Sequence, residues 1–90
     1  MIFEWDPGKA RSNLRKHRVS FQEAMTVLRD PMAATNFDPD HSLAEQRLVT
    51  FGISSRGRLL VVAHTETDDM IRIISARLAS RMERGIYEEG

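Results

Sequence analysis

The stretch from residue 71 to residue 88 changes its hydrophobic period partway along, and this change limits the folds open to the chain. It begins with closely spaced isoleucines, which suit a buried strand, and continues as a charged segment with helical spacing. Ser80 and Glu83 have the spacing of a capping box, in which a hydroxyl and a carboxylate bond two free amides at a helix start. We therefore expect a strand over about 71–76 and a helix over about 81–88.

The junction between this strand and this helix carries four arginines, Arg72, Arg77, Arg81 and Arg84. A guanidinium group stays charged and donates two parallel hydrogen bonds, so it suits the oxygens of a phosphate. Glu83 and Tyr87 share a face of the helix because they are four residues apart. Arg72 and Arg77 lie on opposite faces of a regular strand, so they reach one site only if the chain bends or bulges after Ser75.

The first part of the chain predicts a short strand and a basic helix. Residues 2–5 alternate between apolar and polar side chains, as a strand does. Asp6 caps the helix, and a proline follows at the first helical position, where its missing amide hydrogen costs nothing. We expect Ala10, Leu14 and His17 to form the core-facing stripe, since they fall at i, i+4 and i+7. The neighbouring stripe consists of Lys9, Asn13 and Lys16.

A second helix follows after a tight corner. Ser20 and Glu23 form another capping box, and Asp30 followed by a proline ends the helix. Only two residues separate the two helices. The first of them, Arg18, is expected to adopt a left-handed backbone conformation, which costs a residue other than glycine very roughly 1 kcal/mol.

The rest of the chain has the pattern of an antiparallel meander. Apolar runs with strand character are joined by short polar turns, one of which we place at 65–69. Together with the N-terminal helices, this pattern predicts an α+β fold with two helices, an antiparallel sheet and one C-terminal helix, in a single domain over residues 1–90. The strands expected in the meander are 47–53, 58–64 and about 71–76, and residues 35–37 before it could form a further strand.

The formal net charge is zero, but the charges are unevenly distributed. Five basic residues and no acidic ones lie between Lys9 and Arg18, and the arginine junction adds a second basic region. The acidic residues gather elsewhere, at 38–45, at 66–69 and near the C-terminal end. We therefore expect a basic face with an acidic rim, a distribution that suits nucleic acid better than a zero net charge suggests.

Composition excludes several classes of protein. The chain has no cysteine, which rules out a disulfide framework and a thiolate zinc site. Its histidines, His17, His41 and His64, lack the short spacing of a metal site, so we expect no metal and no cofactor. No apolar run approaches the ~20 residues that span a bilayer, and the N-terminus lacks the features of a signal peptide. We expect a cytoplasmic protein without a membrane contact.

Several motifs, taken in order, resemble the BrnT family of bacterial toxins over essentially the whole chain. They are FEWDPGKARSNLRKH, VSFQEAMTVLRDP, DPDHS followed by EQR, RGRLLVV and IRIISARLASRMERGIYE. The resemblance implies a RelE-like fold and a ribonuclease activity that blocks translation. It also implies a hetero-oligomer with a cognate antitoxin of the BrnA type, whose ribbon-helix-helix domain would supply the only contact with DNA. Arg18, Leu78 and Met82 depart from the residues common in the family, which are glycine at the first position and basic residues at the other two.

Cleavage of RNA without a metal ion has three chemical requirements. A proton must leave the 2′-hydroxyl, the negative charge of the phosphorane must be stabilised, and the leaving 5′-oxygen must gain a proton. The candidate catalytic residues are His17, Arg72, Arg77, Glu83 and Tyr87. The candidates for binding the RNA phosphates are Lys9, Lys16, Arg47, Arg81 and Arg84.

The same candidates also have structural interpretations. The histidine that ends the first helix could be a satisfied helix-end residue, and Glu83 could be a cap whose carboxylate is then a poor general base. Arg72 and Arg77 could form ion pairs worth only about 0–1 kcal/mol, with partners such as Glu45 and Glu66. The alternative function is a non-catalytic module that binds an antitoxin and reaches DNA only through it.

Overall fold

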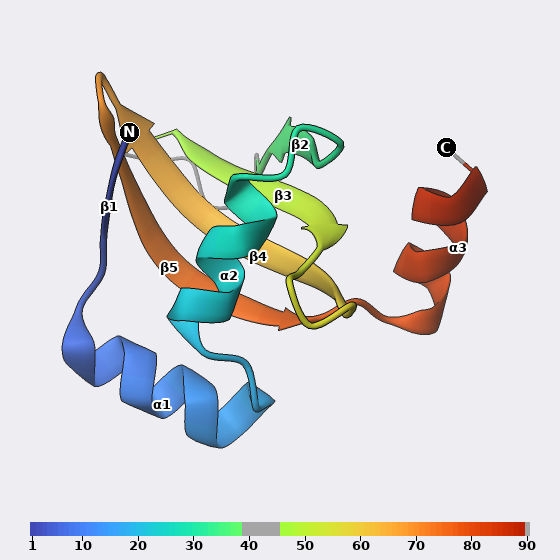
Figure 1. Ribbon diagram of the computed structural model, residues 1–90, viewed down its shortest axis with the longest axis horizontal. Helices are drawn as coiled ribbons and strands as arrows, with labels where there is room; N and C mark the ends of the chain where they lie inside the picture. The colour runs from blue at the N-terminus through green and yellow to red at the C-terminus, as the bar shows by residue number, and fades with distance from the viewer. Residues whose placement is uncertain (39–45, 90) are drawn as a thin grey trace.

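The computed structural model describes residues 1–38 and 46–89, which form an α+β fold around a five-stranded sheet (Figure 1). None of the described helices has the length and apolar character needed to cross a membrane. In chain order the elements are β1 (Ile2–Glu4), α1 (Pro7–His17), α2 (Phe21–Leu28), β2 (Ala34–Phe37), β3 (Arg47–Ile53), β4 (Leu59–Thr67), β5 (Met70–Leu78) and α3 (Arg81–Glu89).

The sheet is mixed, whereas the sequence predicted an antiparallel one. Its strand order is β1-β5-β4-β3-β2. The expected antiparallel meander is formed by β3, β4 and β5, and β2 pairs antiparallel with β3. β1 pairs in parallel with β5, with Ile2 opposite Met70 and Glu4 opposite Arg72. The prediction was wrong at this point because a parallel neighbour lies far away in the sequence and leaves no local turn signal.

The hairpin between β4 and β5 is also longer than predicted. The sequence suggested a turn over 65–69, but β4 continues to Thr67, and only Asp68 and Asp69 lie between the strands. Asp68 has a positive φ of 44°, as tight hairpin turns require. The threonines of this segment favour extended backbone, and their polarity hid the strand from a search based on apolar runs.

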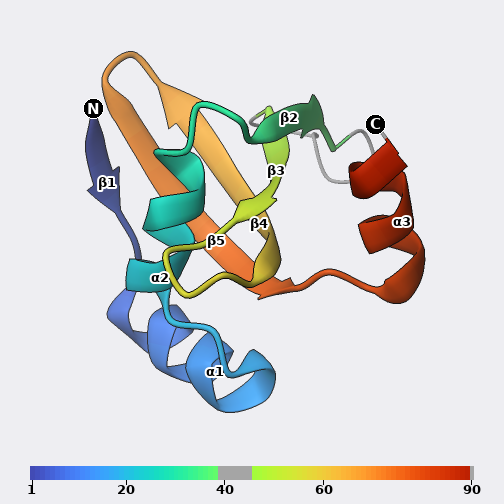
Figure 2. The same cartoon turned by 45° about the vertical axis from the view of Figure 1, so that its right-hand side comes forward.

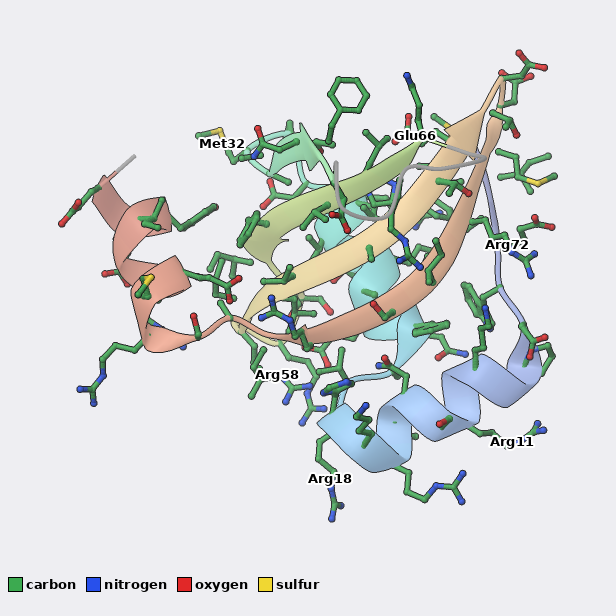
Figure 3. The ribbon with its side chains drawn as sticks, turned by 180° about the vertical axis from the view of Figure 1, so that it is seen from behind. Arg11, Arg18, Met32, Arg58, Glu66 and Arg72 are labelled. Atoms are coloured by element: carbon green, nitrogen blue, oxygen red, sulfur yellow. The ribbon has the colours of Figure 1, made fainter. Side chains whose placement is uncertain are left out.

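The core lies between one face of the sheet and the two N-terminal helices. α2 contacts β3, β4 and β5, and α1 contacts β5. α3 lies apart from α1 and α2, on the side of the sheet where β2 and β3 lie (Figure 2). In the described part of the chain, neither N-terminal helix covers the opposite face of the sheet, which is seen in front in Figure 3. The fully buried core side chains are Val19, Phe21, Ala24, Val27, Leu60, Val62, Ile73 and Ala76.

α1 turns a different stripe toward the core than its apolar pattern predicts. Leu14 is 49% exposed, whereas Asn13 is only 7% exposed. The Asn13 amide donates to the carbonyls of Ala76 and Val19 at 2.8 and 2.9 Å, and its oxygen accepts from the Ala76 amide at 3.1 Å. Because β1 pairs only with the first residues of β5, the backbone N–H and C=O groups farther along that edge need hydrogen-bond partners from side chains such as Asn13. The prediction that Leu14 faces the core was wrong for this reason.

The corner between α1 and α2 has the expected left-handed residue. Arg18 has φ 60° and ψ 32°. Its carbonyl accepts a hydrogen bond of 3.0 Å from Arg58, the residue before β4. The same guanidinium holds Glu23 of α2, so the corner, α2 and the start of β4 are tied together.

Basic and acidic side chains gather at different places. The tip of the β4–β5 hairpin carries Glu66, Asp68 and Asp69, all of them exposed. In Figure 3, Glu66 lies far from Arg18 at the end of the basic helix α1. The acidic residues expected at 40–45 lie outside the described residues.

Candidate active site

A bulge in β5 decides which arginines share a surface. The pairing with β4 skips Ile74, which is an extra residue in the strand. Without this residue, the spacing of Arg72 and Arg77 would place them on opposite faces of the sheet; with it, they face the same side. The bulge lies one residue before Ser75, close to the position that the sequence required.

Arg72 nevertheless lies away from Arg77. Its guanidinium bonds Glu4 of β1 at 3.1 Å, at the other end of β5 (Figure 3). The strand between the two arginines spans roughly 16 Å at about 3.3 Å per residue. The two side chains of the pair with Glu4 are 44% and 42% exposed, so this pair is of the weak surface kind. The partner is neither of the glutamates considered from the sequence: Glu66 lies beside a histidine, and Glu45 is outside the described residues.

Arg77 and Glu83 form a two-pronged ion pair between β5 and α3. Nη1 and Nη2 of Arg77 donate to the two carboxylate oxygens at 2.7 and 2.9 Å. The carboxylate also accepts from the Ser80 amide at 2.8 Å, and the Ser80 hydroxyl accepts from the Glu83 amide at 3.2 Å. This completes the expected capping box. Glu83 therefore starts the helix and orients the arginine at the same time.

The ion pair fixes the charges of both partners. The hydrogen bonds from Arg77 are the main reason why the pKa of Glu83 falls to about 2, and the Ser80 amide adds to the effect. The carboxylate in turn raises the pKa of Arg77. At neutral pH, Glu83 is an anion with little affinity for a proton, which makes it a poor general base.

Arg77 keeps part of its hydrogen-bonding capacity after this pairing. A guanidinium has five N–H donors, and here described residues use three: two bond Glu83, and one bonds the Leu78 carbonyl at 3.3 Å. The Arg77 side chain is 43% exposed. Its two remaining donors can bind an anion that arrives from the open side.

Arg77 lines a cleft on the open face of the sheet, which we name the arginine cleft. The cleft has a volume of about 480 Å³. Arg47 of β3 also lines it, so two cationic side chains from different strands border one space. The complete lining is Asp38, Arg47, Val49, Phe51, Val61, Ala63, Ser75, Arg77 and Glu83.

A second hollow adjoins the arginine cleft, between α3 and the strands β2 and β3, and we name it the α3 groove. Its volume is about 520 Å³. Tyr87 lines it together with Glu83, one helical turn earlier, as their spacing predicts. Glu83 and Phe51 line both hollows, so the cleft and the groove are neighbours that share these two side chains. The complete lining of the groove is Met32, Ala34, Asn36, Phe51, Glu83, Ile86 and Tyr87.

His17 lies with two lysines in a smaller hollow beside α1, which we name the α1 hollow. It has a volume of about 200 Å³, and its wall includes Lys9, Lys16 and His17. Ser75 lines both this hollow and the arginine cleft. The structure thus brings these three candidates together and separates them from Arg77 by the edge of β5.

Arg81 and Arg84 line none of these three hollows and are exposed on α3.

The lining residues Ser75, Asn36 and Phe51 were not anticipated from the sequence. Ser75 reaches the cleft because of the bulge, and no local sequence pattern predicts a bulge. Asn36 falls in the segment whose pattern is hardest to interpret, and an aromatic residue in an apolar strand is ordinarily a core residue.

The histidines do not form a metal site in residues 1–38 and 46–89, where no group of three or more histidine, cysteine, aspartate or glutamate side chains could hold a metal ion. His41 is outside this range. His64 is a core residue whose Nε2 lies 2.7 Å from the Thr50 hydroxyl. Burial lowers its pKa to about 4.

Comparisons with known proteins identify one family. The model of a family described as the ribonuclease toxin BrnT of type II toxin-antitoxin systems matches residues 5–83. No curated protein matches the sequence. Among solved structures, the crystal structure of the ribonuclease toxin BrnT from Brucella abortus is similar, with a TM-score of 0.64 and 22% identity, over 90% of this chain and 100% of that chain. At this identity the likeness supports the fold alone.

Proposed function

Because the chain belongs to the BrnT family of ribonuclease toxins of type II toxin-antitoxin systems, we propose that it cleaves RNA in the arginine cleft, without a metal ion, and thereby inhibits translation. The proposal includes a RelE-like fold and a cytoplasmic hetero-oligomer with a cognate antitoxin of the BrnA type. The antitoxin neutralises the toxin and makes the contact with DNA.

The observation that carries the proposal is the orientation of Arg77 before any substrate binds. Glu83 holds its guanidinium from one side, and two N–H donors remain at the cleft. A cation that is already oriented needs no rearrangement when negative charge grows on a phosphorane, which is the main source of electrostatic catalysis. Arg47 supplies a second positive charge across the same cleft.

Proton transfer is assigned to residues other than Glu83, which has a positioning role. Two groups with suitable chemistry lie at the two ends of the site, Tyr87 in the α3 groove and His17 in the α1 hollow. General acid–base catalysis typically contributes about 10²–10⁴-fold to a rate. Cleavage rates of Tyr87→Phe and His17→Gln therefore decide between them, since only the residue that moves a proton should lose a factor of this size.

The remaining cations of the candidate set are assigned to the RNA on either side of the cleft. Lys9 and Lys16 border the α1 hollow, and Arg81 and Arg84 are exposed on α3. We assign all four to phosphates that flank the scissile one. Arg72 is assigned to its ion pair with Glu4 instead, since its position in the strand places it at the far end of β5.

The test compares RNA cleavage by the purified chain and by two arginine variants, in the presence of EDTA. Arg77→Ala should lower the rate about 10²–10³-fold, the size of effect seen when one donor to a developing oxyanion is removed. Arg72→Ala is the matched control from the same strand and should cleave at the parent rate. Equal rates for Arg77→Ala and the parent would refute the site, and loss of cleavage on addition of EDTA would refute the metal-independent mechanism.

A non-catalytic binding module is the second candidate function, and α3 is the observation in its favour. No residue of α3 is buried, and Met82 and Ile86 are 76% and 66% exposed. Apolar surface of this kind suits a protein partner. This function predicts tight binding to the protein of the neighbouring reading frame and normal growth when the chain is expressed alone. Growth arrest that Arg77→Ala relieves would decide for the ribonuclease.

A further inference from the structure

We propose that the α3 groove is a nucleobase subsite, in which the base next to the scissile phosphate packs on Tyr87 and Phe51 and is recognised by the side-chain amide of Asn36. The inference rests on the proposed function, and it adds a base preference to it.

The α3 groove is a direct neighbour of the arginine cleft. Glu83 and Phe51 line both hollows, so a phosphate bound at Arg77 would lie next to the space beside Tyr87. A nucleotide has this combination of groups, since its anionic phosphate lies close to a flat base. The groove volume of about 520 Å³ also falls within the range of roughly 300–1,000 Å³ that small-molecule sites occupy.

The wall of the groove is mostly aromatic and apolar. Tyr87 and Phe51 supply aromatic surface, and single-stranded RNA is ordinarily recognised by bases that are unstacked and packed on such side chains. Met32 and Ile86 add apolar surface, and they are 79% and 66% exposed without a ligand. These side chains provide area for a base but no means to tell one base from another.

Asn36 has the side chain that can make that distinction. It lies on β2, is exposed and lines the groove, and within the described chain its side chain bonds no other residue. The neighbouring Thr35 projects from the other face of the strand and bonds the Thr50 hydroxyl at 2.8 Å. An amide offers both a donor and an acceptor, so it can read the edge of a base. Asn36 is therefore the specificity-determining residue of this subsite.

A protein segment is the competing occupant, and the shape of the groove favours the base. Met82 is the most exposed apolar side chain of α3, yet it lies outside the groove lining. An amphipathic partner segment would be expected to cover it. The groove instead combines a small apolar space, one amide and direct access to two arginines.

The first experiment is an NMR titration of the full chain with each of the four nucleoside 3′-monophosphates. The Asn36 side-chain amide and the Ile86 methyl groups should show saturable shifts, with one base binding more tightly than the others. Tyr87→Ala, which removes aromatic surface from the groove, should weaken binding about tenfold or more, as loss of base stacking does. Asn36→Leu should reduce the preferred nucleotide to the affinity of the others. Gln22→Leu, an exposed amide on α2, is the matched control and should change nothing.

The second experiment maps cleavage sites in a random-sequence RNA. The parent should cut beside one preferred base, and Asn36→Leu should flatten that preference. An unchanged base preference in Asn36→Leu overturns the inference. It is also overturned if nucleotides shift only the NMR signals of Arg47 and Arg77 and inorganic phosphate causes the same shifts. Either result leaves the ribonuclease proposal intact.

If nucleotides shift the NMR signals of the groove residues but the parent cleaves no RNA, the ribonuclease proposal is refuted and the subsite is kept. Coverage of Asn36 and Ile86 by the neighbouring reading frame's protein, with no shift from any nucleotide, overturns the subsite in favour of a protein partner.

Discussion

Two arginine–glutamate pairs in this molecule are both two-pronged but have different surroundings. Arg58 holds Glu23 through Nε and Nη2, and Arg77 holds Glu83 through Nη1 and Nη2. In the first pair the glutamate side chain is 4% exposed and the arginine 26%. In the second pair the values are 24% and 43%. The pairing itself therefore does not distinguish an arginine that holds the fold together from one that can bind a ligand.

The other contacts of each pair make that distinction. Ser54 donates to Glu23 at 2.6 Å, and Arg58 donates to the Arg18 carbonyl at 3.0 Å, so the first pair is closed by protein groups. The hydrogen bond from Arg58 is the main cause that lowers the pKa of Glu23, against the burial that raises it. The second pair borders a cleft of about 480 Å³ with two N–H donors still unused by described residues. A closed pair stabilises the fold, whereas an open one is available for chemistry.

The largest expected effect comes from breaking the closed pair. Arg58→Ala leaves the buried Glu23 carboxylate with Arg56, at 3.9 Å, as its remaining cation. Removal of one partner from a buried pair costs about 3–5 kcal/mol. Urea denaturation should show this loss in the free energy of unfolding. Arg77→Ala is the matched change in the open pair and should cost about 1 kcal/mol or less, because exposed pairs contribute little. Equal losses in the two variants would contradict the comparison.

Acid should destabilise the fold through His64 before it discharges either glutamate. The ring is 1% exposed, and burial lowers its pKa from 6.5 to about 4. As the pH falls below 6.5, the His64 ring is protonated in the unfolded chain but stays neutral in the folded chain. The free energy of unfolding therefore decreases until the folded ring is also protonated near pH 4. The full decrease is roughly 3 kcal/mol, of which about 2 kcal/mol is lost by pH 5.

Urea denaturation between pH 7 and pH 4.5 tests this window. His64→Gln should be less stable than the parent at pH 7 but should lack the decrease toward pH 5. The contribution of Glu83 belongs to a lower range, since its pKa is lowered from 4.5 to about 2: it is fully present above pH 4.5 and is lost as the pH falls toward 2. A parent whose stability is constant from pH 7 to pH 5 would show that the ring is not held neutral in the core.

The sequence predicted the parts of the fold that depend on local chemistry. The capping hydroxyls of Ser20 and Ser80 accept the expected amides, and Arg18 is left-handed as the tight corner required. The strand pairing of β1 and the burial of Asn13 could not be predicted in the same way. Both depend on the edge of β5, whose partners come from residues more than sixty positions away in the chain.

The candidate site was predicted in its residue types more than in its arrangement. Arg77, Glu83 and Tyr87 come together because β5 leads directly into α3, so their spacing was informative. Arg72 has the same chemistry but pairs with Glu4, a contact set by the parallel strand that the sequence did not indicate. Residue types reveal which groups can bind a phosphate, but topology decides which of them face one cleft.

Glu83→Gln separates the two roles of this residue. The glutamine oxygen can still accept from the Ser80 amide, so the start of α3 is kept, but the charge that orients Arg77 is lost. We expect kcat for RNA cleavage to fall about tenfold with a smaller change in KM, because a misplaced catalytic group acts mainly on the transition state. Glu4→Gln removes the charge from the other pair on β5 and is the control that should keep kcat. A Glu83→Gln variant with parental kcat would show that the open pair is only structural.

The smallest expected effect is at the corner that the closed pair supports. Arg18 adopts φ 60°, which costs a residue with a Cβ atom about 1 kcal/mol, whereas glycine adopts it freely. Glycine is also more flexible in the unfolded chain, which offsets roughly half of that gain. Arg18→Gly should therefore stabilise the fold by about 0.5 kcal/mol in urea denaturation, since the carbonyl that Arg58 bonds is kept. Asp68→Gly, at φ 44° in the hairpin far from this pair, should give a similar gain. If Arg18→Gly instead destabilises the fold while Asp68→Gly does not, the closed pair depends on the Arg18 side chain as well as on its carbonyl.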